Sequence, residues 1–217
     1  NQVGLFAEPK AIFIYPNFLN SLDRRQILSG FAEIIKHALI CDEEYWKSIK
    51  KADIDNITDL TSLIVRSVEI KNDFVTADPF EEGERKALNF GHTIGHAVET
   101  FSLMKNKLPL LHGEAIAVGM VCEAYLSKAV AGLPEKQLQE ITSYIKSKYA
   151  PFVINKSMDD YIIDLMLNDK KNEYQKINFT LLKNIGEAQI NYTCSESLIK
   201  EALHYYRSEF NDAIMLN

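Results

Sequence analysis

Two histidines spaced four residues apart are the first feature of this 217-residue sequence that could do chemistry. His92 and His96 lie in the stretch RKALNFGHTIGHAVE, residues 85–99, whose apolar residues recur at helical intervals. The spacing fits three interpretations: one shared metal ion, separate roles in one site, or satisfied core histidines. It lacks the glutamate of the HExxH metalloprotease motif, so the pair alone does not decide among them.

The same stretch places other polar groups near the histidines. On one continuous helix, Arg85 and Asn89 would form a single stripe with His92 and His96. A stripe of this kind is costly to bury unless each group has a partner. Gly91 and Gly95 weaken a helix, so they indicate the close approach of a ligand or of another helix.

Further candidate ligands lie in two other predicted helices. His112 and Glu114 stand where a helix begins, and a histidine at a helix start can point into a cleft. Glu33 and Lys36, three apart inside an apolar helix, share one face and are costly to bury unless paired or coordinating. Glu33 and His37 form an alternative pair that could hold a metal. One carboxylate with two histidines is a common ligand set of catalytic zinc.

Several basic residues could bind an anion, although most lysines and arginines of helices lie on solvated faces. These residues are Lys36, Lys71, Arg85, Lys86, Lys170 and Lys171. Lys36 and Arg85 stand out because they share faces with the candidate ligands. The sequence has neither a GxGxxG nor a GxxxxGK[ST] phosphate loop.

The composition is that of an ordinary globular protein, with 47% hydrophobic and 25% charged residues. A net charge of −6 argues against a nucleic-acid partner or a membrane surface, which would require a basic face. No apolar run approaches the roughly 20 residues of a membrane span. Three cysteines without a CxxC motif predict reduced thiols and a cytoplasmic location.

Periodicity predicts a mainly helical domain over residues 1–217, with a short N-terminal strand at 11–15 and a small β-hairpin. Ser21 is the candidate N-cap of the first helix. The predicted helices cover about 21–42, 43–51, 57–73, 84–101, 112–130, 135–148, 157–166 and 195–208. The hairpin covers 176–192 and turns at 184–186.

Four motifs together resemble the 3-dehydroquinate synthase family of sugar-phosphate cyclases. They are GFAEIIKHALI, NFGHTIGHAVE, LHGEAIAVGM and the DKK ahead of the hairpin, and KNDFVTADPFEEGERKALNFGH resembles the family's approach to the histidine motif. The resemblance covers essentially the whole chain but only the family's C-terminal, mostly helical part. It implies the metal-binding half of a two-domain dehydroquinate synthase-like fold, without the N-terminal NAD-binding domain.

The resemblance also implies roles for individual residues. Zn2+ or Co2+ would be held by Glu33, His92 and His112, whereas His96 would contact substrate and move protons. His96, Glu81 and Lys36 are the implied catalytic residues. The implied substrate-binding residues are Asn1, Lys36, Lys71, Arg85, Asn89, His96 and one lysine of the DKK motif, Lys170 or Lys171. Phe18, Leu19, Asn20 and Ser21 match a segment that lies against NAD+.

The implied reaction converts the sugar-acid phosphate 3-deoxy-D-arabino-heptulosonate 7-phosphate into 3-dehydroquinate and phosphate, in the shikimate pathway. NAD+ is used catalytically, so the enzyme class is a lyase. We expect this fragment to be inactive alone and the full-length protein to be a homodimer. The alternatives are a related cyclase, a metal-dependent polyol dehydrogenase, or a non-catalytic helical interaction domain.

Overall fold

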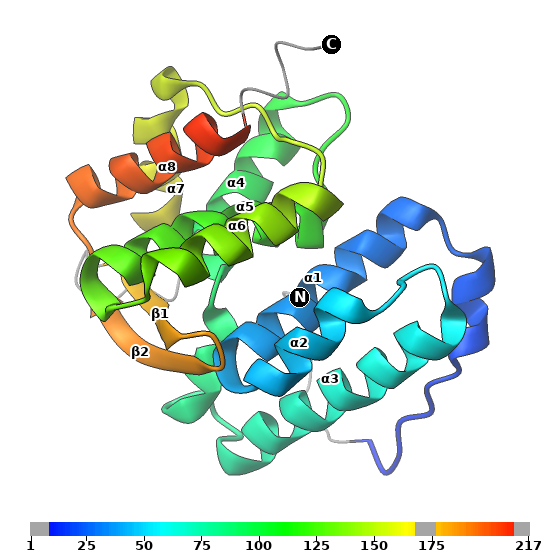
Figure 1. Cartoon of the computed structure of the whole chain (residues 1–217). Helices are drawn as coiled ribbons and strands as arrows, with labels where there is room; N and C mark the ends of the chain where they lie inside the picture. The colour runs from blue at the N-terminus through cyan, green and yellow to red at the C-terminus, as the bar shows by residue number, and fades with distance from the viewer. Residues whose placement is uncertain (1–8, 168–176, 211–217) are drawn as a thin grey trace.

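A computed structural model describes residues 9–167 and 177–210, and it consists of packed helices with one β-hairpin (Figure 1). The long helices are α1 (Arg24–Cys41), α2 (Glu43–Lys51), α3 (Ile57–Ala77), α4 (His92–Lys105), α5 (His112–Leu126), α6 (Glu135–Lys148), α7 (Asp159–Leu167) and α8 (Glu196–Phe210). Shorter helical segments are η1 (Pro16–Ser21), η2 (Glu84–Asn89), η3 (Ser127–Ala131) and η4 (Lys156–Met158). The strands are β1 (Asn178–Asn184) and β2 (Glu187–Thr193), which pair antiparallel. The predicted mainly helical class is confirmed.

Helix α5 occupies the centre of the structure. Its sequence, HGEAIAVGMVCEAYL, is apolar nearly all round, as expected for a helix with neighbours on every side. It contacts α1, α4, α6 and α8, and Figure 1 shows α1, α2 and α3 grouped on one side of it and α7 and α8 on the other. Packing against these helices therefore holds α5, which begins at His112, in place.

The predicted helix over 84–101 is wrong as one continuous element. The chain forms the 3-10 segment η2, then a break, and α4 begins only at His92. Gly91 lies at the break with φ 78°, a left-handed conformation that glycine adopts without strain. The predicted stripe of Arg85, Asn89 and the two histidines therefore does not exist as a helical face, and only His92 and His96 share a helix.

Two expectations for the N-terminal part are also wrong. Residues 11–15 form no strand and pair with no described strand, and Phe13 is 95% exposed. An apolar run makes a stable strand only when another strand pairs with it. The N-cap of α1 is Asp23 rather than Ser21, since the Asp23 carboxylate accepts the backbone N–H of Arg25 at 2.8 Å.

The hairpin is confirmed, and it packs against the segments that lead to the site. At its turn Gly186 donates its N–H to the Leu39 carbonyl of α1 at 2.8 Å. The Thr180 hydroxyl of β1 donates to the Lys86 carbonyl of η2 at 2.8 Å. The hairpin thus holds α1 and η2 from one side.

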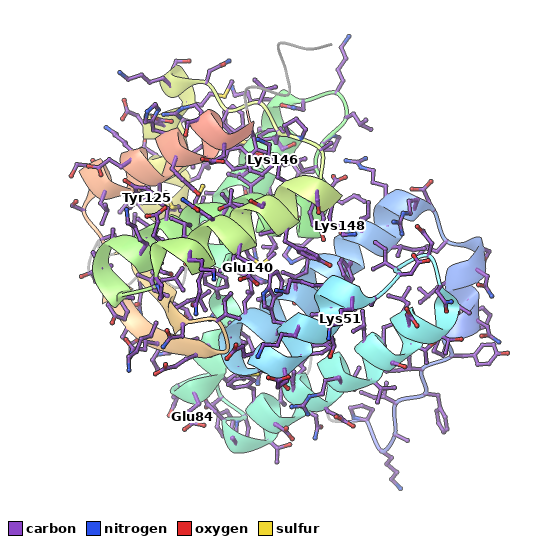
Figure 2. The ribbon with its side chains drawn as sticks, viewed as in Figure 1. Lys51, Glu84, Tyr125, Glu140, Lys146 and Lys148 are labelled. Atoms are coloured by element: carbon purple, nitrogen blue, oxygen red, sulfur yellow. The ribbon has the colours of Figure 1, made fainter. Side chains whose placement is uncertain are left out.

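Helices α2 and α6 are joined by a polar contact at the surface. The Glu140 carboxylate of α6 accepts the indole N–H of Trp46 at 2.7 Å and pairs with Lys50. Figure 2 shows Glu140 on the side of α6 that faces α2. This contact joins α2 to the helices on the other side of the molecule.

The three cysteines, Cys41, Cys122 and Cys194, are free thiols, as predicted. Among the described residues, no helix combines the length and the apolar character that crossing a membrane requires.

Candidate metal and substrate site

Three helices bring Glu33, His92 and His112 together. Glu33 lies in the middle of α1, while His92 and His112 are the first residues of α4 and α5. Glu33 Oε1 lies 3.5 Å from His92 Nε2 and 3.7 Å from His112 Nε2. Residues separated by as many as 79 positions in the sequence thus meet through one carboxylate oxygen.

The other ring nitrogen of each of these two histidines has its own partner. His92 Nδ1 lies 3.1 Å from the Phe90 carbonyl, to which it can only donate. His112 Nδ1 lies 3.0 Å from the Glu99 carboxylate. With Nδ1 protonated on both rings, each Nε2 presents a lone pair towards Glu33. This is the arrangement in which histidines usually bind metals.

The cluster fits a divalent metal ion. Glu33 Oε1 is buried and has no hydrogen-bond partner, which is costly for a carboxylate oxygen in the absence of a cation. In a tetrahedral zinc site with ligand bonds of about 2.1 Å, neighbouring ligand atoms lie about 3.4 Å apart. The two distances from Glu33 Oε1, 3.5 and 3.7 Å, are close to that value.

His96 lies in the same cluster and defines a second possible ligand set. Its ring centroid is 5.1 Å from that of His92 and 5.7 Å from that of His112. Ligand atoms of these three histidines all lie within 4.8 Å of one another. The geometry therefore admits either Glu33 or His96 as the third ligand, and the predicted exclusion of His96 from the metal stays a prediction.

Burial and local charges favour the protonation states that metal binding requires at Glu33 and His92, but not at His112. Burial alone would raise the pKa of Glu33, but His112, Lys36 and His92 outweigh it and hold that pKa well below its usual range. Burial and the Lys36 charge lower the pKa of His92 to about 3, so its ring is neutral. The pKa of His112 is raised, mainly by contact with Glu33 and against the effect of burial, with Glu99 adding to the rise.

Glu33 and Lys36, which share one face of α1, form an ion pair. Lys36 is 3% exposed, and its Nζ lies 2.7 Å from Glu33 Oε2. The alternative metal pair of Glu33 and His37 is not favoured. His37 faces α3, where its Nδ1 lies 2.7 Å from the Ser67 hydroxyl, and burial lowers its pKa to about 4.

Glu81, Arg85 and Asn89 lie together on the approach to α4. The Asn89 side-chain amide donates to Glu81 Oε1 at 2.7 Å, and Glu81 has φ 60°, which is unusual for a residue other than glycine. Arg85 donates to the Pro79 carbonyl at 2.7 Å. Lys71 lies on α3, exposed at the surface, and its charge helps to lower the pKa of His37.

The remaining predicted site residues lie in other parts of the chain. Phe18, Leu19, Asn20 and Ser21 belong to η1, where Leu19 and Asn20 line a pocket together with Ile54 and Leu60. Asn1, Lys170 and Lys171 lie outside the described residues.

Glu99 is the site residue that the sequence interpretation missed. It lies three residues after His96 and seven after His92, so all three share one face of α4. A helical projection of residues 92–105 would have placed a carboxylate beside the histidines. What it could not show is that Glu99 orients His112, which comes from another helix.

A model of the 3-dehydroquinate synthase C-terminal family matches residues 30–172. This range includes Glu33 and the three clustered histidines, His92, His96 and His112. The chain belongs to the 3-dehydroquinate synthase C-terminal family. A 3-dehydroquinate synthase from Parabacteroides distasonis is 47% identical over 212 residues, covering 97% of this chain and 60% of that protein. One from Thermoanaerobacter pseudethanolicus is 37% identical over 205 residues, covering 92% of this chain and 56% of that protein. The chain thus spans about 60% of the length of these curated relatives.

Solved structures show the same fold. A 2-epi-5-epi-valiolone synthase from Streptomyces hygroscopicus, with NAD+ and Zn2+ bound, superposes with a TM-score of 0.74 at 22% identity, over 89% of this chain and 54% of that one. A 2-deoxy-scyllo-inosose synthase with carbaglucose-6-phosphate, NAD+ and Co2+ gives 0.72 at 23% identity, over 87% and 54%. The arrangement of helices in the 3-dehydroquinate synthase C-terminal chain is that of these cyclases.

Proposed function

We propose that this chain is the metal- and substrate-binding part of a 3-dehydroquinate synthase. The reaction converts 3-deoxy-D-arabino-heptulosonate 7-phosphate into 3-dehydroquinate and phosphate, a lyase reaction of the shikimate pathway without net oxidation. The observation that carries the proposal is the convergence of Glu33, His92 and His112 from three helices, in a chain of this family. We also expect the full-length protein to be a cytoplasmic homodimer.

Glu33, His92 and His112 are the proposed ligands of a divalent metal, Zn2+ or Co2+. The metal, when bound, acts as a Lewis acid on substrate hydroxyls, and NAD+ takes up and returns a hydride. The two structural neighbours contain NAD+ with Zn2+ or Co2+, which supports the choice of cofactors. Lys36 contacts only Oε2 of Glu33, so the lone pairs of Oε1 stay available to the metal.

The substrate is an anion with a carboxylate and a phosphate, so it requires converging cations. Lys36, Lys71, Arg85 and a lysine of the DKK motif, Lys170 or Lys171, are the proposed partners of these groups, with Asn1 and Asn89 binding hydroxyls. Arginine binds phosphate or carboxylate through two parallel N–H groups, which fixes the orientation of the substrate. Phe18, Leu19, Asn20 and Ser21 are the proposed contacts to NAD+.

Proton transfers are assigned to His96 and Glu81. His96 stands one turn after His92 on α4, next to the proposed metal. Glu81 is held in place by Asn89 at 2.7 Å. A histidine and a carboxylate beside the same substrate can remove one proton and deliver another during elimination and ring closure.

Metal binding by single variants tests the ligand set. We expect one zinc per chain, with affinity reduced more than about 100-fold in Glu33→Ala, His92→Ala and His112→Ala, because each loses a direct ligand. His96→Ala is the matched control, since it removes a neighbouring histidine of the same cluster. Competition with a chromophoric chelator measures the affinities. Loss of zinc in His96→Ala with retention in Glu33→Ala would instead establish the three-histidine set.

The reaction itself is tested with the full-length protein. Purified enzyme with NAD+ and zinc should release phosphate from the heptulosonate phosphate and form 3-dehydroquinate. Turnover only of a different sugar phosphate would establish a related cyclase, and net NADH formation from a polyol would establish a dehydrogenase. A folded protein that binds no metal would favour an interaction domain.

A further inference from the structure

The face of α1 that carries Glu33 also holds the beginning of α5. Arg25, Ser29 and Glu33 are spaced four residues apart, so they follow one another along one side of α1. They face three consecutive residues of α5 in reverse order: Arg25 meets Glu114, Ser29 meets Gly113, and Glu33 meets His112. The proposed metal ligands are thus the last of three contacts between these two helices.

The first contact is a two-point ion pair. Arg25 Nε donates to Glu114 Oε1 at 2.6 Å, and Nη2 donates to Glu114 Oε2 at 2.6 Å. Nη2 also donates to the Pro109 carbonyl at 2.7 Å. Glu114 Oε2 in turn accepts the Leu111 N–H at 2.8 Å, which caps the start of α5. One guanidinium therefore fixes both the first turn of α5 and the loop that leads into it.

The second contact leaves no space between the two backbones. Gly113 donates its N–H to the Ser29 hydroxyl at 3.0 Å. A Cβ at position 113 would lie 1.9 Å from the Ser29 carbonyl oxygen, so only glycine allows this approach. Because His112 and Gly113 are adjacent, a shift at this contact would move the His112 ring relative to Glu33.

We propose that Arg25 and Ser29 are positioning residues for the metal site, acting through Glu114 and Gly113 to set the spacing between Glu33 and His112. Eight residues of helix rise, about 12 Å, separate Arg25 from Glu33, so Arg25 is too far away to contact the metal itself. The inference rests on the proposed function, because it concerns the same metal. Displacement of one ligand by a fraction of an ångström weakens a metal site whose other ligands stay fixed.

The test measures metal affinity and coordination in variants of this chain. Arg25→Gln removes the ion pair and should weaken zinc binding roughly 10- to 100-fold, the usual effect of losing a group that orients a ligand. Ser29→Ala removes one hydrogen bond and should weaken zinc binding about threefold to tenfold. With Co2+ in place of zinc, both variants should alter the visible d–d bands, because the ligand geometry changes. Arg25→Lys keeps the positive charge but loses the pair of N–H donors that bind both Glu114 oxygens, so it should bind zinc more tightly than Arg25→Gln but less tightly than the unmodified chain.

Arg24→Gln is the matched control. Arg24 is the neighbouring residue of the same turn, and it forms an ion pair with Asp55 at 2.8 Å away from α5. Its loss should leave zinc affinity and the Co2+ spectrum unchanged. If Arg25→Gln and Ser29→Ala match Arg24→Gln in both measurements, the positioning role is wrong. If Arg25→Gln does not fold by circular dichroism, Ser29→Ala decides. If the unmodified chain binds no metal, the proposed function fails instead.

Discussion

The three proposed metal ligands differ in how firmly they hold protons. The pKa of Glu33 lies well below its usual range and that of His92 is about 3, so neither group binds a proton near neutral pH. The pKa of His112 is raised above 6.5, chiefly by Glu33. In the metal-free protein, His112 is therefore the ligand for which protons and metal ions compete.

The pH dependence of zinc binding should follow His112 alone. Below the pKa of His112 its Nε2 carries a proton that the metal must displace, so affinity should fall about tenfold per pH unit. The fall should begin above pH 6.5, because the pKa of His112 is raised. Competition titrations between pH 5.5 and 8.5 measure it. A slope of two protons per metal would contradict this account.

Glu99→Gln should move the same pH profile. The Glu99 carboxylate contributes to the raised pKa of His112, so its neutral isostere should shift the fall in affinity to lower pH. The same variant should weaken binding at high pH, since the ring of His112 loses its charged orienting partner. An unchanged profile would show that Glu99 does not act on His112.

At the level of elements, the contact between α4 and α5 sets the positions of His92 and His96. Glu123 of α5 is 0% exposed and accepts the N–H groups of Gly91 at 2.6 Å and Ile94 at 3.0 Å. Gly91, the N-cap of α4, has no side chain to serve this purpose. Glu123 therefore caps α4 from another helix. These backbone hydrogen bonds lower its pKa, but burial has the larger effect and raises it to about 8.

Gly119→Ala should destabilise this contact strongly. A Cβ at position 119 would lie 2.0 Å from the Gly91 carbonyl oxygen, so α4 and α5 would have to separate. We expect the free energy of unfolding to fall by about 2–4 kcal/mol in urea titrations. Gly30→Ala is the control: Gly30 also lies in a helix, but its Cβ would meet nothing within 4 Å. That substitution should leave stability unchanged or raise it by about 0.5–1 kcal/mol. Equal effects of the two substitutions would be inconsistent with a close α4–α5 contact.

Periodicity was sufficient for most elements, because their apolar residues repeat with the period of the structure that they form. The close approach predicted from Gly91 and Gly95 is confirmed, since a Cβ at Gly95 would lie 2.8 Å from Ile116 Cδ1 of α5. The break before His92 is not evident from the sequence, because residues 85–99 keep a helical pattern on both sides of Gly91. The strand at 11–15 was wrong because a strand depends on a partner that local sequence does not reveal.

The site residues were accessible from sequence to different degrees. Glu33 and Lys36 follow from one apolar helix, since a buried charge needs a nearby partner. Their meeting with His112 depends on how α1 packs against α5, and no spacing along the chain encodes that contact directly. The family motifs supplied the grouping, and the geometry of Glu33, His92 and His112 is consistent with it.

At the scale of the whole molecule, a metal at this site would link α1 to α4 and α5, two helices that are distant from it in the sequence. Figure 1 shows α1 grouped with α2 and α3, while α4 and α5 pack with the C-terminal helices. Zinc at 100 times its dissociation constant should add about 2.7 kcal/mol to the free energy of unfolding. For a chain of this size that corresponds to a rise of about 5–11 °C in Tm. Calorimetry should detect the rise in the unmodified chain and in His96→Ala but not in His92→Ala.

Metal binding and catalysis should separate in this chain. The chain spans about 60% of the length of its curated relatives, and the NAD+ contacts proposed within it are limited to one short segment, η1. We therefore expect the 217-residue chain to bind zinc about as tightly as the full-length protein does, because Glu33, His92 and His112 all lie within it. With NAD+, zinc and the heptulosonate phosphate, the chain should release no phosphate above background, whereas the full-length protein should turn over. Hydride transfer would require NAD+ to be held in a fixed position beside the substrate, and Phe18, Leu19, Asn20 and Ser21 of η1 are the contacts proposed for it within this chain. Turnover by the chain alone would show that these residues suffice to hold NAD+.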